Sequence, residues 1–329
     1  KPSIGGQAVI EGVMGLYDGK GFKDDSFSAN HIAKSTKTPT ILVVNIKGKS
    51  LSLVAEIKGY LGFMENRIAG VILNNCSEGM YAIYKKLLEE NGIKTYGHLP
   101  RVPEAYIGSR HLGLITAEEI SDIKKKMDML GKAAEKSLDL DGIMKLGKGA
   151  ATLEYKDLTI SPRRDESSVK IGIARDKAFC FYYEDVLEMF EDLGARLIPF
   201  SPVEDEHLPC DISGLILGGG YPELHIEKIS QNKSMLKEIK QASEDEMPIY
   251  AECGGFMYLG ESIEISSKKY KTVGAIEGNS HVTKSLVRFG YKDLEANVDN
   301  VLCRKGESIR CHEFHYSDTD SYGTGFTAS

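Results

Sequence analysis

Cys253 stands in a sequence pattern that is typical of a catalytic nucleophile. Residues 248–251 (PIYA) predict a short strand, and residues 256–259 (FMYL) predict the start of a helix. The small residues Ala251 and Gly255 stand two positions before and two positions after Cys253. A nucleophile elbow has this pattern, because its tight turn presents the reactive side chain and small neighbours let the strand and the helix pack closely. We therefore predict Cys253 as a nucleophile, against the alternative of a buried structural cysteine.

Backbone N–H groups near this cysteine are expected to form an oxyanion site. Gly254 follows the nucleophile directly, and Gly219 belongs to a glycine turn, residues 218–220, that ends another predicted strand. Preorganised N–H donors of this kind stabilise the negative charge of a tetrahedral intermediate. A helix that begins at Cys253 also directs the positive end of its dipole at the sulfur, so we expect the thiolate form to be favoured.

The elements that position these residues alternate between strands and helices. In the first half, apolar β-branched segments predict strands at residues 9–10, 41–46 and 69–73, and periodic segments predict helices at 51–61 and 80–90. The capping-box sequence that runs from Thr116 to Glu119 predicts the start of a third helix, which continues to about Leu138.

The second half repeats this alternation. Strands are predicted at residues 169–174, 196–200, 213–217 and 248–251, with helices at 184–193 and 236–242. Residues 161–168 (SPRRDESS) are polar and predict a linker. We therefore expect an α/β protein of two doubly wound domains, residues 1–160 and 169–329, whose ligands bind beyond the carboxyl ends of the strands.

The composition excludes several classes of protein. The formal net charge is −7, from 41 Lys and Arg against 48 Asp and Glu, which argues against nucleic-acid and anionic-membrane partners. No apolar run approaches the roughly 18 residues that a membrane span needs. The 6 cysteines include no C-x-x-C pair, so neither a disulfide framework nor a structural zinc is expected. We expect a cytoplasmic protein.

Six segments, spread over nearly the whole chain, resemble the cobyrinic acid a,c-diamide synthase family. They are residues 251–259 (AECGGFMYL), 174–183 (ARDKAFCFYY), 217–225 (LGGGYPELH), 312–317 (HEFHYS), 9–19 (VIEGVMGLYDG) and 110–114 (RHLGL). The resemblance implies a dethiobiotin-synthetase-like P-loop domain followed by a class I-type glutamine amidotransferase domain. It also implies amidation of two acetate carboxylates of a corrin precursor, with ATP and Mg²⁺ required and glutamine as the ammonia donor. A homodimer is a further expectation.

Two acidic residues gain roles from this resemblance. Glu11 follows the apolar pair Val9-Ile10 and resembles the acid that holds the metal near the phosphates in the family. Asp18 lies in the following glycine-rich turn, near where phosphate would meet substrate. Its alternative role is that of an Asx-turn residue before Gly19.

The P-loop of the family is not found in this sequence. The sequence Gly48-Lys49-Ser50 ends like a Walker motif, but Val43 stands where the pattern needs its first glycine. We therefore expect these residues to form an ordinary loop, and the family places its P-loop upstream of Glu11. The absence of a starting Met and the abrupt end at residues 322–326 (YGTGF) lead us to expect a fragment trimmed on both sides.

His312 and His315 stand near the end of the chain and are disfavoured as bases for Cys253. In the family, the activating histidine lies in a later segment that resembles Tyr-x-His-x-His-Phe, and no such segment occurs before Ser329. The two histidines are three residues apart, so they do not form the H-E-x-x-H zinc motif. Structural or interface roles are the interpretation that we favour for both.

Two other functions remain open at this point. Within the same chemistry, the substrate could be nickel-sirohydrochlorin or hydrogenobyrinate, because the amidated carboxylates are peripheral and no residue reads the central metal. From a different class, the chain could be a non-catalytic paralogue that binds a tetrapyrrole. An upstream glycine-rich loop with Lys and Ser or Thr, and a downstream histidine segment, would identify the enzyme.

Overall fold

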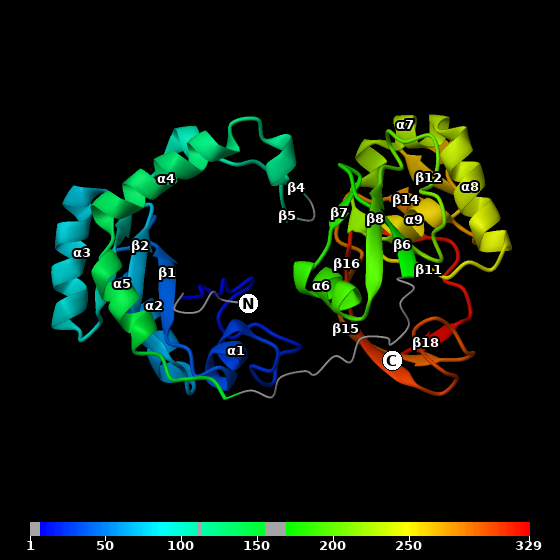
Figure 1. Ribbon diagram of the computed structural model, residues 1–329. Coiled ribbons are helices and arrows are strands. Elements are labelled where there is room, and N and C mark those ends of the chain that lie inside the picture. The colour runs from blue at the N-terminus through cyan, green and yellow to red at the C-terminus, as the bar shows by residue number, and fades with distance from the viewer. Residues whose placement is uncertain (1–6, 111–112, 155–168) are drawn as a thin grey trace. The chain divides into compact units, whose positions relative to one another are not determined.

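The computed structural model describes residues 7–110, 113–154 and 169–329 (Figure 1). The chain divides into two compact units, the first made of Lys1–Ser109 with Ile115–Lys156 and the second of Arg110–Leu114 with Asp157–Ser329. The predicted linker, residues 161–168, lies outside the described residues, as do His111 and Leu112 of one family-like segment. Each unit is built around a parallel sheet, so the expected α/β class is confirmed.

The first unit is a parallel sheet of three strands that is covered by helices. The strands lie in the order β1 (Thr40–Asn45), β2 (Ile68–Asn74) and β3 (Thr95–Leu99). The helices are α1 (Ala29–Ser35), α2 (Ser52–Phe63), α3 (Glu78–Glu90), α4 (Ile123–Ser137) and α5 (Leu140–Lys148). The short helices η1 (Pro103–Ala105) and η2 (Ala117–Glu119) complete the unit. The strand pair β4 (Ser109–Arg110) and β5 (Gly113–Leu114) lies, except for Ser109, in the segment that groups with the second unit.

Burial explains why the predicted elements of this unit form. Leu53 and Ile57 on one face of α2 pack against Val71 and Leu73 of β2, and all four are fully buried. The central strand β2 is buried along its middle, as expected for a parallel sheet covered on both faces. The predicted strands at 41–46 and 69–73 and the predicted helices at 51–61 and 80–90 are confirmed within one to three residues.

Two predictions about this unit are wrong. Val9 and Ile10 do not form a strand, because no described segment pairs with them and their side chains are 94% and 57% exposed. A β-branched pair becomes a strand only when a neighbour supplies hydrogen bonds and a packing surface. Thr116 does bond the side chain of Glu119, at 2.7 Å, but this interaction closes only the single 3-10 turn η2, and the α-helix begins at Ile123.

The second unit contains a parallel sheet of four strands. The order is β11 (Ile249–Ala251), β9 (Leu215–Leu217), β6 (Val169–Ala174) and β8 (Ala195–Phe200). Its helices are α6 (Glu184–Asp192), η3 (Pro222–Leu224), α7 (Ile226–Gln231), α8 (Lys233–Glu244) and α9 (Gly254–Leu259). The predicted strands and helices of this half are all confirmed, with β9 shorter than expected.

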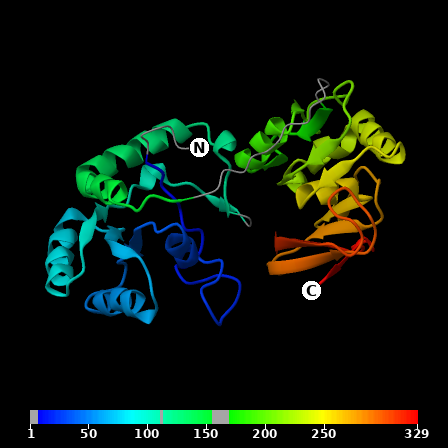
Figure 2. The same ribbon diagram turned by 60° about the horizontal axis from the view of Figure 1, so that its bottom comes forward.

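Further strands extend the second unit beyond the predicted elements. One sheet has the order β13 (Lys268–Lys271), β12 (Ser262–Ile265), β14 (Asn279–Val282) and β17 (Ser317–Thr319). Another has the order β16 (Ser308–His315), β15 (Arg288–Ala296) and β18 (Phe326–Ala328), the orange and red strands of Figure 2. A two-stranded pair joins β7 (Phe179–Phe181) to β10 (Gly219–Gly220). Residues 179–181 therefore form a short strand beside the glycine turn.

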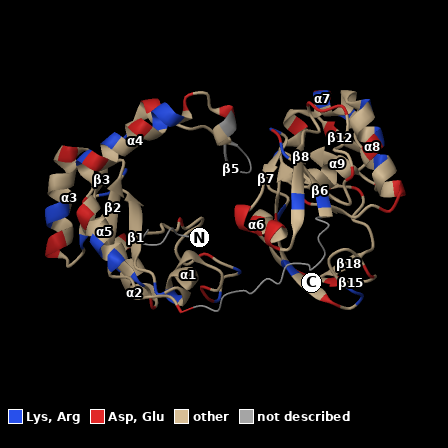
Figure 3. Ribbon diagram, in the orientation of Figure 1, with Lys and Arg blue, Asp and Glu red and all other residues tan. Residues whose placement is uncertain are grey.

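Charged residues of both signs lie along the helices of both units (Figure 3). Within the run Lys124–Lys126, Lys124 and Lys125 are exposed, whereas Lys126 is half-buried, pairs with Asp122 at 3.7 Å and donates to the carbonyls of Glu104 and Tyr106. In the described part of the chain, no helix is both long enough and apolar enough to cross a bilayer.

Candidate active site

Cys253 occupies a strained turn between strand β11 and helix α9. Its backbone angles are φ 49° and ψ −112°, a conformation that non-glycine residues rarely adopt. The two following glycines are required by close packing. A Cβ at Gly254 would lie 2.7 Å from Pro222, and one at Gly255 would lie 2.0 Å from the carbonyl oxygen of Leu217. The strand, the sharp turn and the helix together form the elbow that the sequence predicts.

The glycine turn at residues 218–220 lies beside this elbow. Strand β9, which precedes the turn, pairs in parallel with β11, so that Ala251 lies opposite Leu217. A Cβ at Gly219 would lie 3.4 Å from the Cβ of Cys253. Gly220 has φ 154°, and a Cβ there would lie 2.1 Å from the carbonyl oxygen of Ala178. Gly220 must therefore be a glycine for the turn to follow this path, whereas a Cβ at Gly219 would make an ordinary van der Waals contact with Cys253.

The electrostatic surroundings of Cys253 oppose ionisation of its thiol. Desolvation by the enclosing protein atoms raises the pKa of Cys253, and the carboxylates of Glu223 and Glu252 raise it further. Hydrogen bonds from the backbone N–H groups of Gly254 and Gly220 lower the pKa, but not enough to reverse the shift. The expectation that the helix start favours the thiolate is therefore wrong, because desolvation and two carboxylates outweigh the N–H groups of a six-residue helix.

The N–H groups that reach the sulfur are those of Gly254 and Gly220. Gly254 is one of the two oxyanion residues predicted from the sequence, and Gly220 directly follows the other, Gly219. Both residues stand at backbone positions where a side chain would clash with the neighbouring strand or turn. Two converging N–H donors next to a nucleophile are the arrangement that an oxyanion site requires.

A small pocket brings Cys253 together with the C-terminal strands. The residues that line it with the cysteine are Gly220, Glu223, Met257, Val282, His315, Tyr316 and Ser317. Cys253 is exposed as a residue, although the surrounding protein atoms desolvate its thiol. Glu223 is a residue of this pocket that the sequence reasoning missed, although it stands in the family-like segment 217–225.

His312 and His315 lie on opposite faces of strand β16, because side chains alternate along a strand. His315 lies in the pocket, where its Nδ1 is 2.6 Å from the carbonyl oxygen of Ser317 and its Nε2 is 3.6 Å from Glu313. His312 packs among rings on the other face, 5.0 Å from Tyr291 and 5.5 Å from Phe289. Only His315 therefore lies close to the predicted nucleophile.

Tyr182 is a second residue near the site that the sequence reasoning did not assign. Its hydroxyl donates to the carbonyl of Ala174, at the end of β6, and accepts from the N–H of Gly218 at 2.9 Å. Burial raises the pKa of Tyr182 to about 12, so the hydroxyl stays protonated. Tyr182 therefore ties the start of the glycine turn to the central sheet.

Two other aromatic residues of the same segment differ in burial, because Phe179 is fully buried whereas Tyr183 is exposed.

The predicted phosphate-side residues lie in the first unit. Glu11 is exposed and stands in a segment without helix or strand, and its carboxylate has no hydrogen bond or ion pair in the described part of the chain. The carboxylate of Asp18 lies against Gly15, and the Asp18 N–H donates to the Gly15 carbonyl at 3.0 Å, so Asp18 closes a local turn. Among the described residues, no group of three or more His, Cys, Asp or Glu could hold a metal ion.

Gly48, Lys49 and Ser50 form a loop after β1, as predicted. Lys49 pairs with Glu56 at 2.5 Å, and its carbonyl accepts a hydrogen bond of 2.6 Å from the hydroxyl of Tyr84. The side chain and the backbone of Lys49 are thus both bonded to residues of the first unit.

The fold and the elbow of the second unit define a class of protein. Residues 170–326 match the family model of the CobB/CobQ-like glutamine amidotransferase domain. This match covers the parallel sheet, the glycine turn, Cys253 and the C-terminal strands.

Comparison with curated proteins identifies the family of the whole chain. The chain is 45% identical over 317 residues to the cobyrinate a,c-diamide synthase of Clostridium tetani, covering 96% of this chain and 71% of that protein. It is 43% identical over 320 residues to the protein of that name from Caldanaerobacter subterraneus, covering 96% and 70%. It is 42% identical over 313 residues to the cobyrinate a,c-diamide synthase of Listeria monocytogenes, covering 94% of this chain and 69% of that protein.

The chain belongs to the cobyrinate a,c-diamide synthase family. The family and the enzyme class indicated by the motifs of the sequence are thereby confirmed, namely a glutamine-dependent ligase of cobalamin biosynthesis.

Proposed function

We propose that the protein converts the a and c acetate carboxylates of cobyrinate to amides, with glutamine as the nitrogen donor and ATP as the activator. Residues 1–160 are assigned the synthetase role of a dethiobiotin-synthetase-like P-loop domain, and residues 169–329 the amidotransferase role. The observation that carries this proposal is the strained elbow at Cys253, beside a glycine turn and inside a region that matches a glutamine amidotransferase model.

The chemistry at Cys253 follows from its surroundings. The sulfur attacks the side-chain amide of glutamine, and the oxyanion that forms accepts hydrogen bonds from the N–H groups of Gly254 and of the glycine turn. The tetrahedral intermediate then collapses to a thioester and releases ammonia, and water hydrolyses the thioester to glutamate. Because its surroundings raise the pKa of the thiol, a general base is needed to remove the proton as the sulfur attacks.

The second half-reaction needs an activated carboxylate. A carboxylate does not react with ammonia in water, since hydroxide is a poor leaving group, and phosphorylation by ATP supplies a better one. Glu11 is the residue proposed to hold Mg²⁺. Its carboxylate is exposed and pairs with no group among the described residues, which fits the way proteins bind this ion, through one or two carboxylates together with phosphate oxygens. Mg²⁺ would neutralise phosphate charge during the transfer. Asp18 is proposed to line the substrate side.

The amidotransferase role can be tested with a glutamine-like electrophile. We expect 6-diazo-5-oxonorleucine to form a covalent adduct on Cys253, which mass spectrometry of peptides locates. Cys210 is an internal control, because it is also exposed but lies in no glycine turn or elbow. Excess glutamine should protect Cys253 and leave the background at Cys210 unchanged. Equal labelling of both cysteines, without protection by glutamine, would reject a glutamine site at Cys253.

Two properties complete the proposal. A reaction that consumes ATP and glutamine is placed in the cytoplasm, which supplies both. The homodimer expected from the sequence is checked by light scattering of the purified protein.

A further inference from the structure

The first unit contains a basic pocket that has no part in the proposed reaction. Its charged residues are Lys37, Arg67, Lys94 and Lys145, and Tyr96 forms part of its wall. The pocket is open to solvent and has a volume of about 380 Å³, within the range of sites that bind small molecules. Tyr96 is only 1% exposed, so this part of the wall is a fixed element of the core.

The topology of the sheet brings these cations together. Lys37 precedes β1, Arg67 directly precedes β2 and Lys94 directly precedes β3. Parallel strands begin at one edge of their sheet, so these three residues gather at the amino-terminal edge. Lys145 comes from the last turn of α5, which packs against β3.

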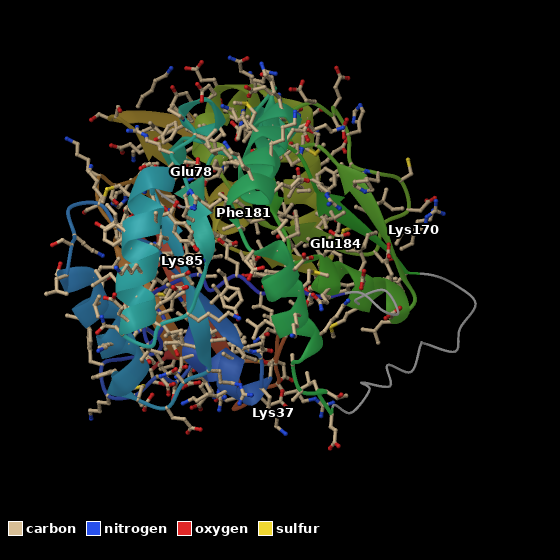
Figure 4. All side chains as sticks on the ribbon, turned by 90° about the vertical axis from the view of Figure 1, so that its left-hand side faces the viewer. Lys37, Glu78, Lys85, Lys170, Phe181 and Glu184 are labelled. Atoms are coloured by element: carbon tan, nitrogen blue, oxygen red, sulfur yellow. The ribbon has the colours of Figure 1, made fainter. Side chains whose placement is uncertain are left out.

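This edge lies opposite the edge at which ligands of such sheets bind. Figure 4 shows Lys37 and Glu78 near opposite ends of the first unit, and Glu78 begins the helix that follows the carboxyl end of β2. Strand β1 has six residues, which separates the two edges by about 20 Å. The basic pocket is therefore distinct from the carboxyl-end region expected to hold nucleotide and substrate.

The side chains that line the pocket carry an excess of positive charge. Among the described residues no Asp or Glu lines it, although the chain as a whole has a net charge of −7. The nearby carboxylate of Asp139 caps α5 by accepting a hydrogen bond of 2.9 Å from the N–H of Gly142. Within the described residues, none of the four cations pairs with a carboxylate. Lys94 instead lies over the ring of Tyr96, with its nitrogen 4.3 Å from the ring centroid.

The nearby end of α5 only partly offsets this charge. The C-terminus of a helix carries a partial charge of about −0.5, against four full positive charges. The carbonyls of Lys145 and Leu146 already accept hydrogen bonds from the N–H of Gly149, at 3.1 and 3.2 Å. Lys145 is therefore not needed to cap the helix and is available to a ligand.

We propose that this basic pocket binds a small, multiply charged anion of the phosphate or carboxylate class. Four cations that converge on one cavity repel one another, and an anion with two or more charges relieves that repulsion. Arg67 can bind a planar carboxylate or a phosphate through two hydrogen bonds, while the lysines act as point charges.

Calorimetric titration of the full-length protein in EDTA, at low ionic strength, tests this proposal. The two probes are inorganic triphosphate and citrate, which represent the phosphate and carboxylate classes, and EDTA removes divalent metal ions from the catalytic region. The paired substitution Lys94→Glu with Lys145→Glu should weaken binding of the better probe at least tenfold. The milder pair Lys94→Gln with Lys145→Gln should weaken it in the same direction, and circular dichroism checks that both variants are folded.

Lys148→Glu combined with Lys86→Glu is the matched control. These two lysines are exposed in the same unit and lie outside the pocket, and the paired substitution changes the net charge by the same amount. We expect the control to bind within about twofold of the parent protein, and Glu11→Gln to leave binding unchanged. Tighter binding of triphosphate or of citrate identifies the ligand class. Equal weakening in the control, unchanged binding in both pocket variants, or no binding of either probe at millimolar concentrations would overturn the proposal.

Discussion

The groups around the thiol of Cys253 raise its pKa. Since Glu223 and Glu252 contribute to the raised pKa, removing the charge of Glu223 should lower that pKa. We expect the pH profile of Cys253 alkylation by iodoacetamide to move to lower pH in Glu223→Gln. The alkylation rate near neutral pH should therefore rise, because more thiolate is present.

Glu191→Gln is the control for this experiment, since Glu191 is an exposed residue of α6 in the same unit. Its profile should coincide with that of the parent protein. A profile that stays in place for Glu223→Gln, or moves to higher pH, would show that Glu223 does not act on the thiol through its charge.

The two histidines of β16 make a second comparison at the scale of residues. Because His312 lies on the face of β16 opposite His315, His312→Asn should leave glutaminase activity of the full-length protein within about threefold of the parent. His315→Asn alters the wall of the cysteine pocket and should lower glutaminase activity roughly tenfold. General-base catalysis contributes about 10²–10⁴-fold, so a loss of about 10³-fold or more in His315→Asn would identify His315 as the base.

Glu11 can be tested independently of the cysteine. In the full-length protein, Glu11→Gln should lower ATP turnover by orders of magnitude and leave glutaminase activity unchanged, because only phosphoryl transfer needs a carboxylate near the metal. Glu90→Gln, on the exposed face of α3, is the matched control. An ATP turnover within about threefold of the parent, roughly 0.65 kcal/mol of barrier, would mean that Glu11 does not hold the metal.

At the scale of elements, the elbow depends on glycines that no other residue can replace. A Cβ at Gly255 would lie 2.0 Å from the backbone oxygen of Leu217, so helix α9 would have to move away from β9. We expect Gly255→Ala to lower the free energy of unfolding by about 2–4 kcal/mol, as measured by urea denaturation. Gly325→Ala is the control, because no atom lies within 4 Å of a Cβ built there. Equal stability of the two variants would contradict the packing described for the elbow.

The elements that could be predicted from the sequence are those with a strong hydrophobic signal. The buried strands β2 and β6 are apolar runs, and α3 shows a helical repeat, so each was located within three residues. The strands β13 (KKYK), β14 (NSHV) and β17 (SDT) are short and polar, and no local pattern distinguishes them from loops. They form because neighbouring strands supply hydrogen bonds, which is information from the tertiary structure.

The same limit applies to the site. Cys253 and Gly254 were found because the elbow is a local pattern of adjacent residues. His315 lines the cysteine pocket from a strand that lies more than fifty residues further along the chain. The sequence does not show that this strand and Cys253 lie close together in space. The raised pKa of Cys253 was also missed, because the helix dipole is visible in the sequence whereas desolvation is not.

At the scale of the whole molecule, the proposed reaction divides between two units that each have their own sheet and core. Release of ammonia from glutamine is assigned to the second unit, and activation of the carboxylate to the first. Externally added ammonia should therefore replace the ammonia that the second unit releases from glutamine, so that amide formation no longer needs Cys253.

Amide formation by Cys253→Ala in the full-length protein, measured with glutamine and separately with ammonium chloride, tests the central claim most directly. Because alanine keeps the Cβ but lacks the sulfur, the variant should lose glutamine-driven diamide formation while ammonium-driven formation stays within about threefold of the parent. Chromatography of the corrin products with mass detection measures both rates. Glutamine-driven formation that persists in the variant, or loss of both activities in a protein that is still folded, would contradict the assignment of Cys253 as the nucleophile that supplies ammonia.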